Sequence, residues 1–187
     1  MPTPEALRTY RVCPYLHRAR PGEAGHPLHV PFPQGAGRLD NPEHYRVLYL
    51  SDHPAGAVAE TFGNHAVWTA GLLAGPPSLP GSARALVTYR ASAWRVLDLD
   101  DAGALLERKL RPSQIVTRDR SVTQRWALAA FRERRWSGVR WWSYYNPRWG
   151  SLGLWDISRL RVESVEPLAW DHPVVVEANG VLLRPIA

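Results

Sequence analysis

The order of the apolar segments limits the possible folds of this chain more than any other feature of its sequence. Strand-like segments outnumber helix-like ones, and the two kinds do not alternate regularly. Regular alternation would predict a doubly wound parallel sheet, so this order predicts an α+β fold with a mixed or antiparallel sheet and flanking helices. The predicted strands cover residues 9–14, 46–50, 83–91, 94–99, 137–145, 151–156 and 160–168.

Three helices are predicted among these strands. Ser51 or Asp52 caps the first helix, which has Pro54 in its first turn. The second helix, residues 100–110, begins with acidic and ends with basic side chains, as the helix dipole favours. The third helix covers residues 118–135 and has an amphipathic pattern. Its predicted buried stripe consists of Val122, Trp126, Ala129 and Ala130.

Glycine and proline mark the irregular segments of the chain. Residues 26–45 contain repeated turn-forming residues and are predicted to form one long loop. Near the end of the chain, Asn179-Gly180 stands between two apolar runs and predicts a β-hairpin over residues 174–186. With 187 residues, of which 45% are hydrophobic, the chain is long enough to bury one substantial core. Residues 1–187 are therefore expected to form a single domain.

Several absences indicate a soluble, cytoplasmic protein. No apolar run approaches the roughly 18 residues that span a bilayer. The first 12 residues lack the basic and apolar regions of a signal peptide. Cys13 is the only cysteine, so the chain forms no internal disulfide and has no cysteine-rich metal site. No membrane association is expected.

The charge of the chain points to an anionic partner. Subtracting 17 acidic from 23 basic residues gives a formal net charge of +6, and Lys109 is the only lysine. Arginine recognises phosphate and carboxylate groups by two-point hydrogen bonding. Nucleic acid and a phosphorylated small molecule are both candidate ligands. A coding bias toward arginine explains the total equally well, so only individual positions are informative.

Glu60 stands out in the stretch RVLYLSDHPAGAVAETFG, residues 46–63. Its helical part places Ala55, Val58, Ala59 and Phe62 on one core-facing stripe. Glu60 projects from the opposite side, beside the small residues Gly56, Ala57 and Thr61. These neighbours would let a ligand approach closely, although an ordinary exposed glutamate remains the alternative.

Familiar motifs for other chemistries are missing from the sequence. It contains no glycine-rich nucleotide loop and no G-x-S-x-G nucleophile motif. His26 and His29 lie close together without a nearby carboxylate or cysteine array, so no metal site is expected. The aromatic run RWWSYYNPRW, residues 140–149, could stack on the bases of single-stranded nucleic acid. Alternation along a strand would bury half of these rings, which favours ordinary core packing.

A series of short motifs in order makes the chain resemble the RES domain family, which occurs in toxins of bacterial toxin–antitoxin pairs. The family pattern runs from a strand ending in YR, through a GGRWN-like loop, to YLS and a helix with A-x-x-E. It continues with a T-Q-x-x-A helix and a GIxYPS strand. The corresponding stretches here are TYR, GAGRLDN, LYLS, AVAE, VTQRWALAA and SGVRWWS, and the resemblance covers roughly residues 8–156.

The resemblance implies an ADP-ribosyltransferase-like fold with a split sheet, and NAD as the bound substrate. Glu60 would stabilise the positive charge that develops on the ribose when the nicotinamide–ribose bond breaks. Arg11 and Arg38 would clamp the pyrophosphate or its neighbouring ribose. Tyr49 would hold the nicotinamide or the ribose, unless it is a core residue. Ser143 would hydrogen-bond the substrate and orient Glu60.

The resemblance also implies a partner and a biological role. The chain would be a toxin that depletes NAD by hydrolysis or phosphorolysis and thereby arrests growth. Its partner would be an Xre-like helix-turn-helix antitoxin, which inserts its C-terminus into the NAD pocket, so DNA would be contacted only through the antitoxin. Two alternatives stay open: an ADP-ribosyltransferase that modifies a cellular protein, and a non-catalytic nucleic-acid-binding module whose affinity falls steeply with salt.

Overall fold

Seven strands form one mixed sheet in the computed structural model, which describes residues 7–92 and 94–187. Residues 1–6, the start of the N-terminal segment considered above, lie outside the described residues. The strand order is β4-β5-β6-β2-β1-β3-β7, and only the β4–β5 pair is parallel. The strands are β1 Leu7–Tyr15, β2 Leu48–Ser51, β3 Ala83–Ala91, β4 Val96–Asp98, β5 Gly138–Trp142, β6 Gly150–Leu154 and β7 Leu160–Pro167. The predicted α+β fold with a mixed sheet is confirmed.

The sheet divides into two halves between β1 and β2. These antiparallel neighbours share one register pair, Tyr10 with Ser51. By contrast, β1 pairs with β3 along its whole length, from Leu7 to Tyr15. The ladder between β1 and β2 is therefore limited to this one pair, and the two strands diverge beside it.

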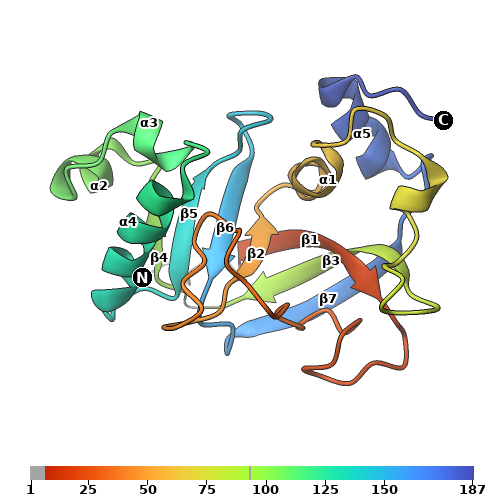
Figure 1. The fold of residues 1–187 in the computed structure, drawn as a ribbon, viewed down its shortest axis with the longest axis horizontal. Coiled ribbons are helices and arrows are strands. Elements are labelled where there is room, and N and C mark those ends of the chain that lie inside the picture. The colour runs from red at the N-terminus through yellow and green to blue at the C-terminus, as the bar shows by residue number, and fades with distance from the viewer. Residues whose placement is uncertain (1–6, 93) are drawn as a thin grey trace.

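The helices lie in two groups beside the two halves of the sheet (Figure 1). One group packs near β4 and β5, and the other contains α1 and α5, which contact each other. The helices are α1 Pro54–Phe62, α2 Ala102–Glu107, α3 Pro112–Ile115, α4 Arg120–Arg132 and α5 Pro173–Leu182, with a 3-10 turn at Ala70–Leu72. The sequence analysis missed α3 and the 3-10 turn, which are too short to show a period.

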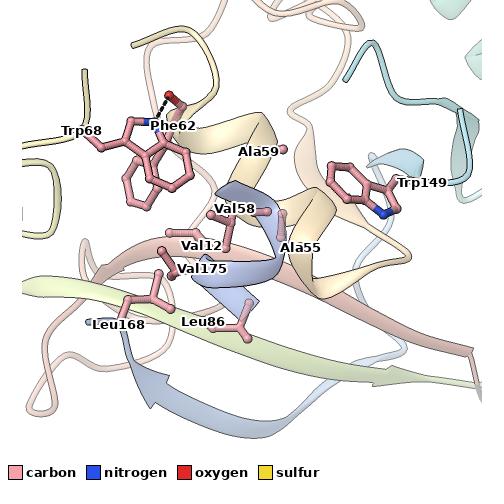
Figure 2. Packing of buried hydrophobic residues seen from close by; sticks show 12 residues of the cluster. Val12, Ala55, Val58, Ala59, Phe62, Trp68, Leu86, Trp149, Leu168 and Val175 are labelled. Carbon is pink, nitrogen blue, oxygen red and sulfur yellow. Dashed lines mark hydrogen bonds between the residues drawn. The ribbon is translucent and has the colours of Figure 1, made fainter. Parts of the chain in front are cut away.

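The core stripe predicted for α1 is confirmed. Ala55, Val58, Ala59 and Phe62 are all buried, in a cluster that joins α1 to β1, β3 and α5. Figure 2 shows this cluster, in which the indole N–H of Trp68 donates to the carbonyl oxygen of Phe62 over 3.1 Å. The cluster fixes the orientation of α1, and with it the direction in which Glu60 points.

The predicted cap of α1 was wrong. His53 is the N-cap, and its Nδ1 atom accepts a hydrogen bond from the backbone N–H of Ala55 at 3.2 Å. Ser51 is instead the last residue of β2, and Asp52 accepts a hydrogen bond from the N–H of Gly150. Both residues that were predicted as caps therefore hydrogen-bond Gly150, the first residue of β6, instead of the start of α1.

The predicted C-terminal hairpin was also wrong, because residues 173–182 form helix α5. Val175 and Ala178 are buried against α1, which turns an apolar run into a helix by tertiary packing. His172 caps the start of α5, where its side chain accepts from Val174 N. The side chain of Asn179 bonds both backbone polar groups of Arg184, so this asparagine closes the helix end instead of a hairpin turn.

The predicted buried stripe of α4 is confirmed in part: Trp126 and Ala130 are buried, and Val122 is half-buried against the same core cluster. The buried residues of α4 are Thr123, Trp126, Ala127 and Ala130, whereas Ala129 is exposed. The observed set follows the i, i+3, i+4, i+7 spacing of a helix that packs on one side. No helix in the described ranges is long and apolar enough to cross a membrane.

Candidate functional site

A cavity of about 310 Å³ opens where β1 and β2 diverge. Its size is at the lower end of the range for small-molecule sites. The walls come from β1, the loop before β2, β2, α1, α4, β5 and β6. The lining residues are Tyr10, Arg11, Val12, Gly37, Arg38, Tyr49, Leu50, Ala57, Glu60, Thr61, Arg120, Trp141, Tyr144 and Ser151. Four of the five residues predicted for the site, Arg11, Arg38, Tyr49 and Glu60, are among them.

Glu60 is held in the cavity wall by two serine hydroxyls. Ser143, immediately after β5, donates to Glu60 Oε1 over 2.7 Å, and Ser151 in β6 donates to the same oxygen over 3.0 Å. Both serines are buried, whereas Glu60 is exposed. The contact predicted between Ser143 and Glu60 is therefore present, although Ser143 itself does not line the cavity. The second oxygen of Glu60 accepts no hydrogen bond from any described residue.

The neighbours of Glu60 on α1 are arranged differently from the prediction. Ala57 and Thr61 line the cavity, as the small-residue face suggested. Gly56 does not, because it is buried against Ser51 and Trp149, and a Cβ atom there would collide with the Ser51 hydroxyl. Gly56 thus lets α1 approach the end of β2, and the room beside Glu60 comes from Ala57 and Thr61.

The loop that carries Arg38 is organised by Asp40. One Asp40 carboxylate oxygen accepts the backbone N–H groups of Gly35 and Gly37 at 2.8 and 2.7 Å, and the other accepts the Tyr49 hydroxyl at 2.6 Å. Gly37 has no space for a side chain, because a Cβ atom would overlap the Tyr49 hydroxyl. These contacts turn the loop so that the next residue, Arg38, lines the cavity.

The guanidinium group of Arg38 is anchored by a segment that the sequence analysis did not resolve. It donates to the carbonyl oxygens of Ile115, at the end of α3, and of Thr117, the latter over 2.9 Å. It also lies over the ring of Trp141, 6.0 Å from the ring centroid. Burial lowers the pKa of Arg38 and the nearby Arg120 guanidinium lowers it further, whereas the Glu60 carboxylate raises it.

Tyr49 supports the loop more than it faces a ligand. Its hydroxyl donates to Asp40 and accepts from the N–H of Leu39 at 2.9 Å. Burial and the Asp40 carboxylate raise the pKa of Tyr49 well above its ordinary value, so the hydroxyl stays protonated and keeps donating. Tyr49 also lines the cavity, so its side chain belongs both to the loop support and to the cavity wall.

Arg11 directs its guanidinium group to the loop that follows β1. Successive side chains of a strand point to opposite faces, so Arg11 shares a face with Cys13, whereas Val12 packs in the cluster around α1. The guanidinium donates to the carbonyl oxygen of His29 over 3.0 Å and to that of Pro27 over 3.5 Å. Arg11 therefore ties the loop after β1 to the strand, next to the cavity opening.

Among the cavity-wall residues that were not predicted from the sequence, Ser151, Trp141, Tyr144 and Arg120 carry polar or aromatic groups. Ser151 gave no signal, because a serine in a strand is common. Trp141 and Tyr144 were considered only as parts of an aromatic run. Tyr144 is 68% exposed, with the Arg118 guanidinium 5.9 Å from its ring centroid. Arg120 lies outside the apolar stripe predicted for its helix and gave no signal of its own. Within residues 7–92 and 94–187, no cluster of three or more metal-ligating side chains is present.

Comparisons with known proteins agree with this architecture. The family model of the RES domain matches residues 9–172. A chain in the crystal structure of the M. tuberculosis MbcT-MbcA toxin-antitoxin complex has a similar fold, with a TM-score of 0.61 and 19% sequence identity. The match covers 95% of this chain and 90% of that one. A comparison with curated protein sequences gave no match.

Proposed function

The chain belongs to the RES domain family, and from this premise we propose that it is a toxin that cleaves NAD at the nicotinamide–ribose bond. The observation that carries the proposal is the pair of serine hydroxyls that fix one oxygen of Glu60 in a cavity with arginines on another wall. A carboxylate held in this way fits a substrate that combines a cationic reacting centre with an anionic group.

The proposed reaction uses the arrangement as follows. The bond between ribose C1′ and the nicotinamide nitrogen breaks, and its electron pair leaves with the nitrogen, so that nicotinamide departs as a neutral molecule. Positive charge develops on the ribose, where the fixed carboxylate of Glu60 stabilises it. An oxygen of water or of inorganic phosphate then forms the new bond to C1′ and releases a proton if it carried one.

Electrostatic contrast within the cavity orients the substrate. Glu60 attracts the ribosyl cation, whereas Arg38 attracts the pyrophosphate oxygens. Arg38 is held by two backbone carbonyl oxygens and forms no ion pair with a described carboxylate, so its charge remains available to an anion. The opposite signs on the two walls favour one direction of binding, with the nicotinamide ribose toward Glu60.

We also propose that an antitoxin protein restrains the enzyme. Two observations support this: the family membership, and the similar fold of a chain that was crystallised as a toxin-antitoxin complex. The cavity opens to the surface beside Tyr144, which is largely exposed. A helix-turn-helix protein of the Xre type with an acidic C-terminal segment would suit this positively charged opening.

Release of free nicotinamide from NAD tests the proposal. Purified protein is incubated with NAD, with and without inorganic phosphate, and the products are separated by chromatography. We expect free nicotinamide together with ADP-ribose, or with a phosphorylated ADP-ribose when phosphate is the acceptor. Absence of nicotinamide under both conditions would exclude NAD cleavage, and label transferred from NAD onto a protein would favour the ADP-ribosyltransferase alternative.

The two serines that hold Glu60 provide a graded prediction. Ser143→Ala and Ser151→Ala should each lower kcat for nicotinamide release by about tenfold or more, because a hydrogen bond to a charged group contributes about 1.5–3 kcal/mol. Steady-state kinetics should show a smaller change in KM, since the anion-binding wall stays intact. Ser164→Ala is the matched control, because Ser164 also donates to a glutamate, Glu166, but lies on β7 away from the cavity.

A further inference from the structure

We propose that Arg120 is a second anion-binding residue of the cavity and that, together with Arg38, it selects ligands that carry a diphosphate group. This inference rests on the proposed function, because it concerns the part of the substrate that does not react. Arg120 lies at the first position of α4, and its side chain contributes to the same cavity wall as Arg38.

The first observation is that Arg120 has unused hydrogen-bonding capacity. Its Nε–H donates to the carbonyl oxygen of Ala36 over 3.1 Å. Its Nη1 group is shielded from water and has no hydrogen-bond partner among the described residues. An unsatisfied buried donor destabilises the ligand-free protein, and an acceptor atom from a ligand would remove that cost.

The second observation is that two guanidinium groups, those of Arg38 and Arg120, line one small cavity. Burial lowers the pKa of Arg38, the Arg120 guanidinium lowers it further, and the Glu60 carboxylate in the same cavity raises it. Neither arginine forms an ion pair with a carboxylate in the described part of the chain. An anion with two negative charges would neutralise both groups at once and make two attractive contacts.

The third observation is that the effect of the Arg120 charge can be separated experimentally from the support that Arg120 gives to the loop at Ala36. Gln124, one helical turn further along α4, donates to the carbonyl oxygens of Gly35 and Gly37 over 2.9 and 3.0 Å. It therefore holds the same loop as Arg120 does, but it carries no charge and does not line the cavity. Gln124 is thus a matched control for loss of loop support.

The experiment measures binding without turnover. Inorganic pyrophosphate and ADP-ribose are titrated by calorimetry into the parent protein and into Arg120→Gln, Arg120→Lys and Gln124→Ala. Arg120→Gln should weaken the binding of both ligands by about 10- to 100-fold, which corresponds to one lost charge-assisted contact. Arg120→Lys should retain part of the affinity because the charge remains, whereas Gln124→Ala should weaken binding less than threefold or so.

Two outcomes would overturn the inference. One is equal affinity of the parent and Arg120→Gln for both ligands. The other is a loss in Gln124→Ala as large as that in Arg120→Gln, because Arg120 would then act only by holding the loop. These outcomes differ from a failure of the proposed function, which would appear as intact, Arg120-dependent pyrophosphate binding without release of nicotinamide from NAD. Circular dichroism of each variant confirms that the fold is retained.

Discussion

Glu60→Gln should abolish most of the nicotinamide release while leaving the fold intact. Glutamine keeps the size of glutamate and can still accept the hydroxyls of Ser143 and Ser151, but it has no negative charge to stabilise a ribosyl cation. Loss of one such electrostatic group lowers turnover by about 10²-fold or more in other enzymes. The initial rate of nicotinamide formation, compared at saturating NAD, measures the effect.

The control for this substitution is Glu177→Gln on α5. Glu177 is also an exposed helical glutamate, and it lies 3.7 Å from His53 rather than in the cavity. The Glu177→Gln variant should release nicotinamide at the parental rate. If Glu60→Gln matches the parent as well, Glu60 has no part in the reaction, and another group must stabilise the developing charge.

Production of the protein without a restraining partner should stop the growth of a bacterial host and drain its NAD. At a turnover of about 10 s⁻¹, which is typical of enzymes, one molecule would destroy roughly 600 NAD molecules each minute. Arg38→Ala, Glu60→Ala and Ser143→Ala should each restore growth, because they remove the anion contact, the carboxylate or its support. Viable counts and extracted NAD, followed after induction, measure both effects.

Protein level is the control for the growth experiment, because a misfolded variant would also be harmless. Immunoblots should show equal amounts of soluble parent and variants. Co-production of the cognate antitoxin should restore growth with the parental sequence unchanged. Growth arrest that persists in the Glu60→Ala strain while NAD remains at its normal level would point to an activity other than NAD cleavage.

Local sequence patterns predicted the parts of the site that depend on one element. The helical spacing of apolar residues within 54–62 predicted the buried stripe of α1 and placed Glu60 on the opposite side of the helix. Resemblance to the RES family then added Arg38 and Ser143, whose motifs are short and follow in order. One helix period and a few motifs suffice to select these residues, although contacts between distant segments fix their final positions.

Other features required contacts between segments far apart in the sequence. Ser151 reaches Glu60 because the register between β2 and β6 places it beside Ser51, under the start of α1. Arg120 and Arg38 line the same cavity because the first turns of α4 hydrogen-bond the backbone of the loop of residues 35–38. Neither of these two arrangements can be predicted from the spacing of the residues along the chain.

The C-terminal hairpin was predicted from a local turn signal, which tertiary packing outweighed. An Asn-Gly pair between apolar runs predicts a hairpin, but residues 173–182 form a helix because α1 offers an apolar surface that buries Val175 and Ala178. Arg11 lines the cavity, and its guanidinium group donates to the carbonyl oxygens of Pro27 and His29, two loop contacts that no local pattern predicts. By itself, the sequence determined the α+β class, the buried stripe of α1 and the direction of Glu60, because these follow from local period and order. Only the tertiary structure placed Ser151 at Glu60, placed Arg120 in the cavity with Arg38, and made the C-terminal segment a helix. Burial and hydrogen bonding between distant segments outweigh local preference at these positions.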